Sequence, residues 1–466
     1  MAGRTGSGSS PRVTYNSAFA LLAPEAATRI PMYLAYSLLL ALAMLVALPY
    51  FAVQGLRHGK HWQNLVERLG RLPAELIERA GRSPGALWIH AVSVGEVVAA
   101  APLARRLKER FPGRRLVIST TTITGQRMAR ERIAWADDFF YYPLDWAWVV
   151  RRVFRAVRPS LVVILETEIW PNFLRVARQS GVPVLFASAR VSERSFRRYR
   201  LTDGLIRRVL ADASVFLPQT EEDARRLVAL GAPEERVRIG GNLKVDVPPP
   251  VRNPLAGWLA DQAARGKRTP VIVAGSVVAG EENAVLAAFA GVRERYPDAL
   301  LVLAPRKPER FEAAAQLAEV RGWGLVRRSS LSLGGALDAG AGILLLDTIG
   351  ELGGLYGVAD LVFVGGSLVR AGGHNILEPA ALGKAPIFGP HMDNFRDIAR
   401  RFLDRGAATQ VATPAELSRQ WVEWLDDPAR RDAAGRAARE LVEANRGAAD
   451  RAFESVEALL ATGDAR

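Results

Sequence analysis

The sequence contains no cysteine and little histidine. Without cysteine, the 466-residue chain cannot form a disulfide, use a thiolate nucleophile or bind a metal through sulfur. The five histidines, which leave little for a histidine-rich metal site, are His58, His61, His90, His374 and His391. The P-loop and HExxH motifs are absent as well, so the sequence lacks the usual signatures of P-loop nucleotide hydrolases and of one large class of zinc proteases.

Lysine is scarce as well, although the chain is basic. Six of the 62 basic residues are lysine, and 48 acidic residues leave a formal net charge of +14. Arginine binds phosphates and carboxylates through paired hydrogen bonds, so the composition predicts anionic partners. The basic residues are spread along the chain rather than clustered with aromatics, so nucleic acid is not a predicted partner.

The remaining composition is that of a globular protein. Hydrophobic residues make up 49% and charged residues 24%, which excludes disorder, collagen and coiled coil as the main architecture. The length predicts two or three domains.

A long uncharged segment near the N-terminus is the main exception to this globular pattern. Residues 30–56 carry no charge over 27 positions, more than the roughly 20 needed to span a bilayer. Four basic residues follow closely and one precedes, which predicts a cytoplasmic location for the rest of the chain: Arg57, Lys60, Arg68 and Arg71 follow, and Arg29 precedes. Pro49 and Gly55 leave open a helix lying in the membrane interface. Residues 1–29 are predicted to be a flexible extension. Met32 stands at the start of the uncharged segment and could be the start of the functional protein, so residues 1–31 are predicted to be dispensable.

Short apolar runs alternate with helical stretches from about residue 84 onward. This alternation predicts two doubly wound α/β domains that face a central cleft, with parallel sheets. The predicted strands are Leu87–Val92, Leu116–Thr120, Leu161–Leu165, Val184–Ala187, Val215–Leu217, Val237–Ile239, Val271–Ala274, Leu300–Ala304, Ile343–Leu346, Leu361–Val364 and Pro386–Phe388. The predicted divisions are an anchor at 30–56, a first domain at 57–246, a proline-rich linker at 247–254, a second domain at 255–425 and C-terminal helices at 426–466.

Two segments of the first domain place carboxylates after predicted strands. In His90–Glu96, Gly95 would allow a tight turn, and Glu96 would then lie in the first turn of a helix. Glu96 is either a general base at the sheet edge or a glutamate that stabilises a helix N-terminus. Glu166 and Glu168 would point the same way from an extended segment, and either could bind a sugar, accept a proton or pair with an arginine.

Three further segments carry basic residues. Ser188–Arg200 contains five arginines after a strand, which indicates either an anion site or a solvated helix face. Gly240–Asp246 is a weak signal, a turn followed by one lysine. Ala304–Arg310 places Arg306 and Lys307 at a strand end, where they could meet a phosphate or form ordinary surface charge.

The glycine-rich segment Gly365–Ala380 is the most informative. It follows a predicted strand and leads into a helix near Asn375, and this geometry can hold a phosphate against backbone N–H groups. Glu378, one turn later, could bind a ribose diol. A dinucleotide fingerprint and a purely structural turn are the competing interpretations, but the fingerprint belongs at the first strand–helix turn of a domain. Asp347–Glu351, after another strand, could contact the same ligand. Together the motifs favour a glycosyl transfer without a metal.

The set of motifs closely resembles that of 3-deoxy-D-manno-octulosonic acid (Kdo) transferases, which glycosylate lipid A. The matching segments are SVGE, ETEIWPN, SARxSxRSxxxY, GNLKxD, APRKPERF, DTIGELxxLYxxAD and GGSLVxxGGHNxLEPA, in order from about Met32 to Phe395. The resemblance implies a GT-B fold, one N-terminal anchor in the bacterial inner membrane and cytoplasmic catalytic domains. It implies CMP-Kdo as donor, a lipid A precursor (lipid IVA) as acceptor, and neither metal nor cofactor.

The resemblance also assigns roles to residues. Glu96 would be the catalytic base, and Glu166 and Glu168 would orient the acceptor or support the base; Leu165 departs mildly from the family pattern. Arg306 would contact the CMP phosphate and Glu378 the ribose. The full donor set would be Pro305, Arg306, Lys307, Ile349, Gly350, Glu351, Gly372, Gly373, Asn375 and Glu378. The acceptor set would be Ser93, Gly95, Arg190 and Ser192.

Two other functions remain open from the sequence. One is a different sugar-nucleotide enzyme of the same fold, a UDP-sugar transferase or an epimerase. The other is a non-catalytic, membrane-anchored lipid-binding protein. A preference for CMP over UDP would distinguish Kdo transfer from the first function. Turnover of CMP-Kdo would distinguish it from the second.

Overall fold

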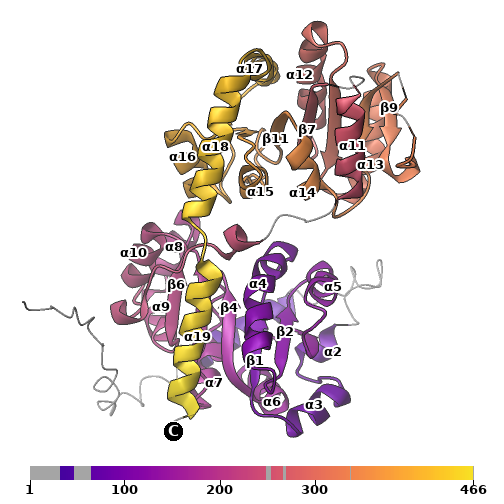
Figure 1. The fold of residues 1–466 in the computed structure, drawn as a ribbon. Coiled ribbons are helices and arrows are strands. Elements are labelled where there is room, and N and C mark those ends of the chain that lie inside the picture. Colours follow the sequence, from indigo (N-terminus) through magenta and orange to yellow (C-terminus); the bar gives the residue numbers. More distant parts are fainter. Residues whose placement is uncertain are drawn as a thin grey trace, which may run out of the picture.

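Two α/β domains, each built on one parallel sheet, make up the protein (Figure 1). The computed structural model describes residues 32–46, 64–247, 253–265, 269–335, 337–338 and 340–464. The predicted extension at 1–29, part of the predicted anchor and most of the proline-rich linker lie outside these residues.

The first domain holds a six-stranded sheet in the order β3-β2-β1-β4-β5-β6. Its strands are β1 Ala86–His90, β2 Leu116–Thr120, β3 Asp138–Tyr141, β4 Pro159–Leu165, β5 Val184–Ala189 and β6 Val215–Pro218. Its helices are α2 Leu65–Arg68, α3 Ala74–Gly81, α4 Val94–Arg110, α5 Ile123–Arg132, α6 Ala147–Val157, α7 Pro171–Gln179, α8 Glu193–Arg200, α9 Asp203–Leu210 and α10 Glu221–Ala229, followed by the 3₁₀ turns η1 Glu234–Arg236 and η2 Leu243–Asp246.

The second domain holds a seven-stranded sheet in the order β13-β12-β11-β7-β8-β10-β9. Its strands are β7 Val271–Val277, β8 Leu300–Pro305, β9 Gly324–Arg327, β10 Ala341–Leu345, β11 Leu361–Val364, β12 Pro386–Phe388 and β13 Thr409–Gln410. The helical elements from here to the C-terminus are α11 Pro254–Ala264, α12 Glu282–Arg295, η3 Pro308–Arg310, α13 Phe311–Val320, η4 Arg328–Ser330, α14 Leu352–Leu355, η5 Tyr356–Val358, α15 Leu377–Ala381, α16 Arg396–Asp404, α17 Pro414–Asp426, α18 Pro428–Ala444 and α19 Ala448–Asp464.

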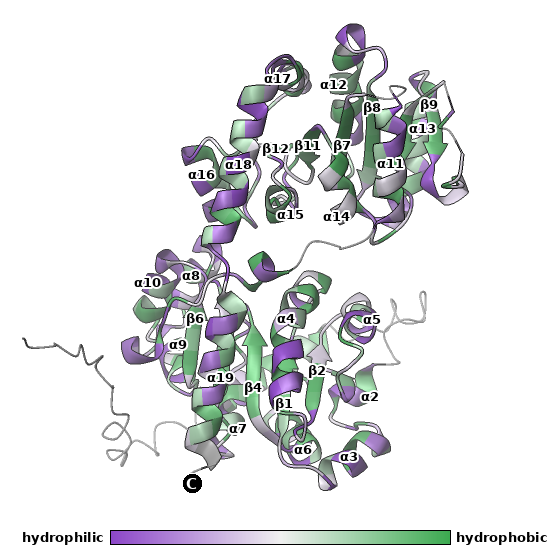
Figure 2. Cartoon of the chain, in the orientation of Figure 1, coloured by the Kyte–Doolittle hydropathy of each residue, from purple (hydrophilic) through white to green (hydrophobic). Residues whose placement is uncertain are grey.

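Each sheet is apolar on both faces because helices cover both of them. Along β1, Leu87 and Ile89 enter one core while Trp88 enters the core on the opposite face. The central strands are accordingly continuous apolar runs, whereas the helices alternate polar and apolar residues (Figure 2). This arrangement confirms the two predicted parallel-sheet domains.

The C-terminal helix returns to the first domain. Helix α19 contributes Ala452, Phe453 and Val456 to the core beneath the first sheet, whereas α17 and α18 pack on the second domain. The carboxylate of Asp246 accepts hydrogen bonds from the backbone N–H groups of Gly447 (2.8 Å) and Ala449 (2.6 Å). The chain therefore passes between the two domains twice, once after Asp246 and once between α18 and α19. Asp246 hydrogen-bonds the start of α19 and so connects the two passages.

One predicted strand is wrong, and three strands were not predicted. Val237–Ile239 is not a strand: Val237 forms one isolated bridge with Phe216, and the chain then turns, with Gly240 and Gly241 donating to the Pro218 carbonyl. Strands β3, β9 and β13 were not predicted from the sequence. Strand β9 is half-exposed at a sheet edge and β13 has two residues, so neither carries a long apolar run.

Part of the predicted anchor is described. Residues 32–46 are helical, and residues 30–31 and 47–56 lie outside the described part of the chain. No helix within the described residues is both long and apolar enough to cross a membrane.

Candidate functional site

Glu96 lies in the first turn of helix α4, which begins at Val94 after β1, and it takes part in a capping box. Ser93 is the N-cap, and its hydroxyl donates to Glu96 Oε1 at 2.8 Å while accepting from the Glu96 N–H. The Val92 N–H donates to Glu96 Oε2 at 2.8 Å. Gly95 lies within the first helical turn, which corrects the tight turn expected there, and a Cβ at Gly95 would meet only Ser93 Oγ, at 3.9 Å. Glu96 therefore hydrogen-bonds the start of α4, and no side chain other than Ser93 lies close to the Gly95 side of this helix start.

Burial gives Glu96 the acidity of a general base. The side chain is 8% exposed, and desolvation together with the nearby Glu166 carboxylate raises its pKa to about 7. Hydrogen bonds from Val92 and Ser93 and the charge of Lys244 act in the opposite direction. A carboxylate with a pKa near the working pH can accept a proton and release it again.

Lys244, which carries only a weak signal in the sequence, lies beside the two carboxylates in the structure. Its ammonium group contacts Glu166 Oε1 at 2.6 Å. Glu166 has φ 56°, a left-handed conformation that turns its carboxylate, so the expected extended segment with two parallel carboxylates is wrong at this residue. Glu168 lies beyond the turn, and burial followed by the Glu166 charge raises its pKa.

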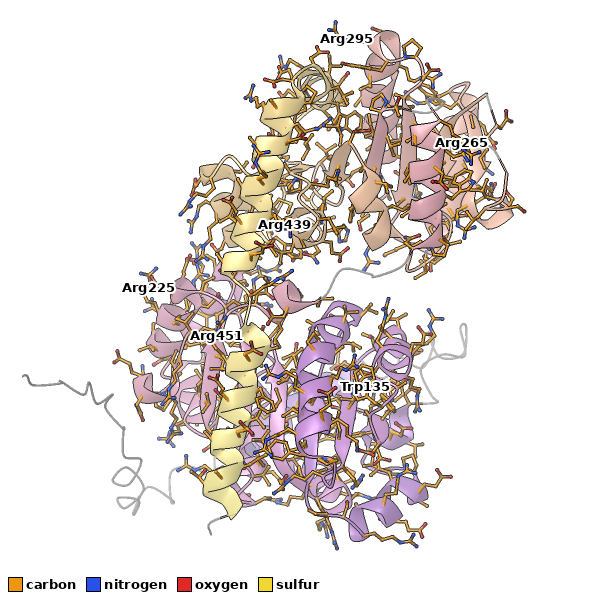
Figure 3. The ribbon with its side chains drawn as sticks, viewed as in Figure 1. Trp135, Arg225, Arg265, Arg295, Arg439 and Arg451 are labelled. Carbon is orange, nitrogen blue, oxygen red and sulfur yellow. The ribbon has the colours of Figure 1, made fainter. Side chains whose placement is uncertain are left out.

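Helix α19 holds the turn that presents Lys244. Arg451 Nε donates to the Gly240 carbonyl at 2.9 Å, and a Cβ on Gly241 would lie 2.7 Å from the Arg451 guanidinium. Arg451 lies on α19 beside the first domain (Figure 3). The signal in the sequence was the double glycine before the lysine, but its partners lie too far along the chain to be predicted from it.

Arg190 and Ser192 occupy different environments. Arg190 donates from its guanidinium to the Asp393 carbonyl of the second domain at 2.8 Å, and its N–H donates to Thr167 Oγ1 at 2.7 Å. Ser192 is the N-cap of α8 and accepts from the Ser195 N–H. The structure therefore places Arg190 where the two domains touch and gives Ser192 a helix-capping position.

Arg306 is exposed at the end of β8, directly after Pro305 and before Lys307. It makes no side-chain hydrogen bond or ion pair with the described residues, so its guanidinium is available to an anion. Its charge acts on His374, whose pKa is lowered to about 4 by burial and then by Arg306. Arg306 therefore lies close to the glycine-rich segment that follows β11.

A buried carboxylate organises the glycine-rich segment. Glu281 is fully buried and accepts hydrogen bonds from the N–H groups of Gly366 (2.6 Å), Ser367 (2.8 Å) and Leu368 (2.7 Å). The first amides of the loop are therefore already satisfied within the protein. These three amides are therefore not free to donate to the expected phosphate.

The later glycines are required by the backbone. Gly372 and Gly373 have φ 90° and 74°, and a Cβ at either would collide with Asn394 or Met392. Asn375 Oδ1 accepts from the Leu377 N–H at 3.1 Å, and its amide donates to Glu378 Oε1 at 3.1 Å. This hydrogen bond orients the Glu378 carboxylate, whose side chain is exposed.

Ile349, Gly350 and Glu351 follow β10, as predicted. Ile349 is 62% exposed, and Gly350 has φ 96°. Glu351 is bound by the Arg328 guanidinium at 3.0 Å, so its carboxylate has an internal partner. Ile349 is the member of this group that presents its side chain to solvent.

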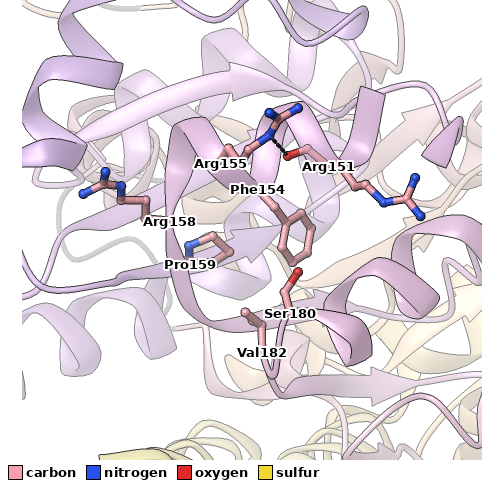
Figure 4. Close-up of a pocket in the computed structure, with 7 residues that line it drawn as sticks. All are labelled: Arg151, Phe154, Arg155, Arg158, Pro159, Ser180 and Val182. Atoms are coloured by element: carbon pink, nitrogen blue, oxygen red, sulfur yellow. Dashed lines mark hydrogen bonds between the residues drawn. The ribbon is translucent and has the colours of Figure 1, made fainter. Parts of the chain in front are cut away.

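A hollow in the first domain lies at the other end of the strands. A cavity of about 390 Å³ is lined by Phe154, Ser180 and Val182 together with arginines of α6 (Figure 4). It adjoins Pro159 at the start of β4, whereas Glu166 follows the end of that strand. Ligands of parallel α/β sheets bind at the carboxyl ends of strands, so the Glu96 edge is the candidate site. Among the described residues, no three His, Asp or Glu side chains are grouped to hold a metal.

Comparisons with known proteins identify relatives of the chain. A family profile described as 3-deoxy-D-manno-octulosonic-acid transferase (kdotransferase) matches residues 63–247. The 3-deoxy-D-manno-octulosonic acid transferase of Haemophilus influenzae is 32% identical over 91% of this chain and 98% of its own. The Bordetella pertussis protein of the same name is 37% identical over 80% of this chain and 86% of its own.

Solved structures show the same fold at low identity. A UDP-N-acetylglucosamine 2-epimerase is 13% identical with a TM-score of 0.56, covering 82% of this chain and 97% of its own. HepE of Anabaena, solved with UDP, is 12% identical with a TM-score of 0.54, covering 81% of this chain and 99% of its own. The extent and identity of the sequence matches decide the assignment: the chain belongs to the 3-deoxy-D-manno-octulosonic acid transferase family of glycosyltransferases.

Proposed function

We propose that this protein transfers Kdo from CMP-Kdo to a lipid A precursor, lipid IVA, in lipopolysaccharide synthesis. Family membership supports the reaction, and one observation supports the mechanism: the Glu96 carboxylate is buried at the sheet edge with a pKa raised to about 7. The loop at 391–395 of the second domain reaches this edge. The centre of the Phe395 ring lies 5.8 Å from Lys244 Nζ. Donor and acceptor would meet there, between the domains.

In this mechanism Glu96 removes the proton of an acceptor hydroxyl. The hydroxyl oxygen forms a bond to the anomeric carbon of Kdo from the face opposite CMP, so the configuration inverts. The bond from that carbon to the CMP phosphate oxygen breaks, and CMP leaves with the electron pair. The proton remains on Glu96 until solvent removes it. Glu166, held by Lys244, and Glu168 would orient the acceptor.

On the donor side, Arg306 would bind the single phosphate of CMP. Asn375 and Glu378 would bind the nucleoside, with the Glu378 carboxylate accepting from the ribose hydroxyls. Pro305, Lys307, Ile349, Gly350, Glu351, Gly372 and Gly373 would line the remainder of this site. One phosphate needs few cations, which suits an exposed arginine beside a glycine-rich loop.

On the acceptor side, Ser93, Gly95, Arg190 and Ser192 would contact the precursor, and the N-terminal segment would anchor the protein to the inner membrane. The helix of residues 32–46 exposes six large apolar side chains, between 58% and 72%: Leu34, Leu38, Leu39, Leu42, Leu45 and Val46. Such a surface is stable against lipid rather than water. The catalytic domains would then face the cytoplasm.

The transfer rate should rise with pH around neutrality. Glu96 must be ionised to accept a proton, and its pKa of about 7 means that the active form is lost as the pH falls from about 8 to 6. We expect kcat/KM for the acceptor to increase over this interval with a midpoint near 7, measured with saturating CMP-Kdo and low concentrations of detergent-dispersed acceptor.

Lys244→Met provides the control that assigns this midpoint to Glu96. Asp145 also has a pKa raised to about 7 by burial, but Lys244 acts on Glu96 and not on Asp145. Removal of the lysine charge should therefore move the midpoint upward. A midpoint that does not move, or a rate that falls from pH 6 to 8, would show that another group controls the reaction.

Transfer itself tests the proposal. Detergent-solubilised protein is incubated with the lipid A precursor and either CMP-Kdo or a UDP-sugar. Product with CMP-Kdo alone supports the proposal, and product with the UDP-sugar alone would place the protein among the other sugar-nucleotide enzymes of this fold.

A further inference from the structure

The helix of residues 32–46 is attached to the first domain by polar contacts near its start. The Tyr33 hydroxyl donates to Asp212 Oδ2 at 2.8 Å, and the Tyr33 side chain is 4% exposed. The Tyr36 hydroxyl hydrogen-bonds the Asp145 carboxylate, and Ser37 Oγ accepts from Asn172 Nδ2 at 3.0 Å. These contacts fall on one helical turn, whereas the exposed leucines continue beyond it.

Asp145 links this helix to α7. The N-cap residue of helix α7, Trp170, makes no side-chain capping hydrogen bond. The carboxylate of Asp145, which lies in the loop after β3, caps the helix instead. It accepts from the Asn172 N–H at 3.0 Å and from the Phe173 N–H at 2.8 Å, while its carbonyl accepts from Asn172 Nδ2 at 2.6 Å. Asp145 and Asn172 are 2% and 1% exposed, so the network is shielded from water.

The start of α7 fixes the segment that precedes it. Residues 166–170 run from the end of β4 to Pro171 without regular structure, and they carry Glu166 and Glu168. Lys244 and the Arg190 N–H hold Glu166 and Thr167, so the start of α7 decides the position of the second half of the segment, which carries Glu168. The Asp145 cap sets that position, and Tyr36 is one of the groups that hold Asp145.

We propose that the helix of residues 32–46 is a positioning element of the acceptor side, in which Tyr36 acts through Asp145 on segment 166–172. The position of the helix and the position of the carboxylates that would orient the lipid are then coupled. Detachment of the helix would loosen the acceptor segment and leave the donor site, in the other domain, unchanged. This inference rests on the proposed acceptor role of the segment.

Two tyrosines of the same helix provide a matched test. Tyr36→Phe removes the hydroxyl that holds Asp145, and Tyr33→Phe removes the hydroxyl that holds Asp212. Each variant loses one hydrogen bond between the helix and the domain, so a general weakening of the attachment affects both. Positioning of segment 166–172 is affected by Tyr36→Phe alone.

The first readout is hydrogen exchange in full-length protein in detergent, which does not depend on activity. We expect Tyr36→Phe to accelerate exchange of the Asn172 and Phe173 amides about tenfold, and Tyr33→Phe to leave them within about twofold. Equal exchange in both variants, or no change in either, would overturn the proposal.

The second readout is transfer kinetics. We expect Tyr36→Phe to raise KM for the lipid acceptor about fivefold, with kcat for bound acceptor and CMP affinity near the wild type. Altered exchange with an unaltered acceptor KM would overturn the coupling to acceptor binding. A wild-type protein without transfer activity would instead refute the proposed function, and the exchange result would still decide whether the helix positions the segment.

Discussion

Glu96→Gln is expected to lower Kdo transfer roughly 10²- to 10⁴-fold while leaving CMP affinity within about twofold of the wild type. Glutamine has nearly the same shape as glutamate and can still accept from the Val92 N–H, but its amide cannot take the acceptor proton. Transfer is measured by release of CMP, and nucleotide affinity by calorimetry. A variant that loses both would show that Glu96 is structural.

Glu416→Gln is the matched control for the capping role. Glu416 forms the same capping box at the start of α17, accepting from the Ala412 N–H at 2.7 Å and donating its own N–H to Thr413 Oγ1 at 3.1 Å. It lies on the second domain, away from the β1 edge. The substitution makes the same change to a capping box outside the site and should leave transfer unchanged, so a similar loss of activity in both variants would contradict the base assignment.

The stability of Glu96→Gln gives an independent check. The folded-state pKa of about 7 lies above the usual value of 4.5, so ionisation of Glu96 opposes folding increasingly as the pH rises from about 5 to about 7. The neutral amide avoids this penalty. The variant should therefore unfold at a temperature equal to or above that of the wild type at pH 8.

Arg306→Ala is expected to weaken CMP binding roughly 10- to 150-fold. A hydrogen-bonded contact between charged groups contributes about 1.5–3 kcal/mol, and the Arg306 guanidinium has no side-chain partner among the described residues that would compensate. Calorimetric titration with CMP measures the effect directly, without the acceptor.

Arg265→Ala controls for the loss of one positive charge in the same domain. Arg265 is exposed at the end of α11, and Figure 3 shows Arg225, Arg265, Arg295 and Arg439 spread over both domains. We expect its removal to leave CMP affinity within about twofold. Arg306→Ala with unchanged CMP affinity would place the phosphate elsewhere and contradict the donor assignment.

The fold was predictable wherever burial on both faces left a continuous apolar run. Leu161–Leu165 and Leu361–Val364 are such runs, and both are strands with fully buried side chains. Prediction failed where pairing rather than composition decides the structure. Gly324–Arg327 becomes a strand because β10 pairs with it, and Val237–Ile239 does not because the chain turns at Gly240.

Within the site, only the positions of residues inside a single motif could be predicted. Spacing placed Glu96 at a helix start and Arg306 at a strand end, and the structure puts both there. Glu166 and Lys244 are 78 residues apart, and Glu281 lies 85 residues before its Gly366 partner. Contacts of that separation arise from the order of strands in the sheet, which residue spacing does not encode.

Mass spectrometry of the lipid acceptor tests the central claim most directly. Detergent-solubilised wild-type protein is incubated with CMP-Kdo and lipid IVA, and the lipid mass is measured beside a reaction with Glu96→Gln. The account predicts a gain of one or more Kdo units with the wild type and a lipid unchanged by the variant. An acceptor that keeps its mass with the wild type, whether or not CMP is released, would contradict it.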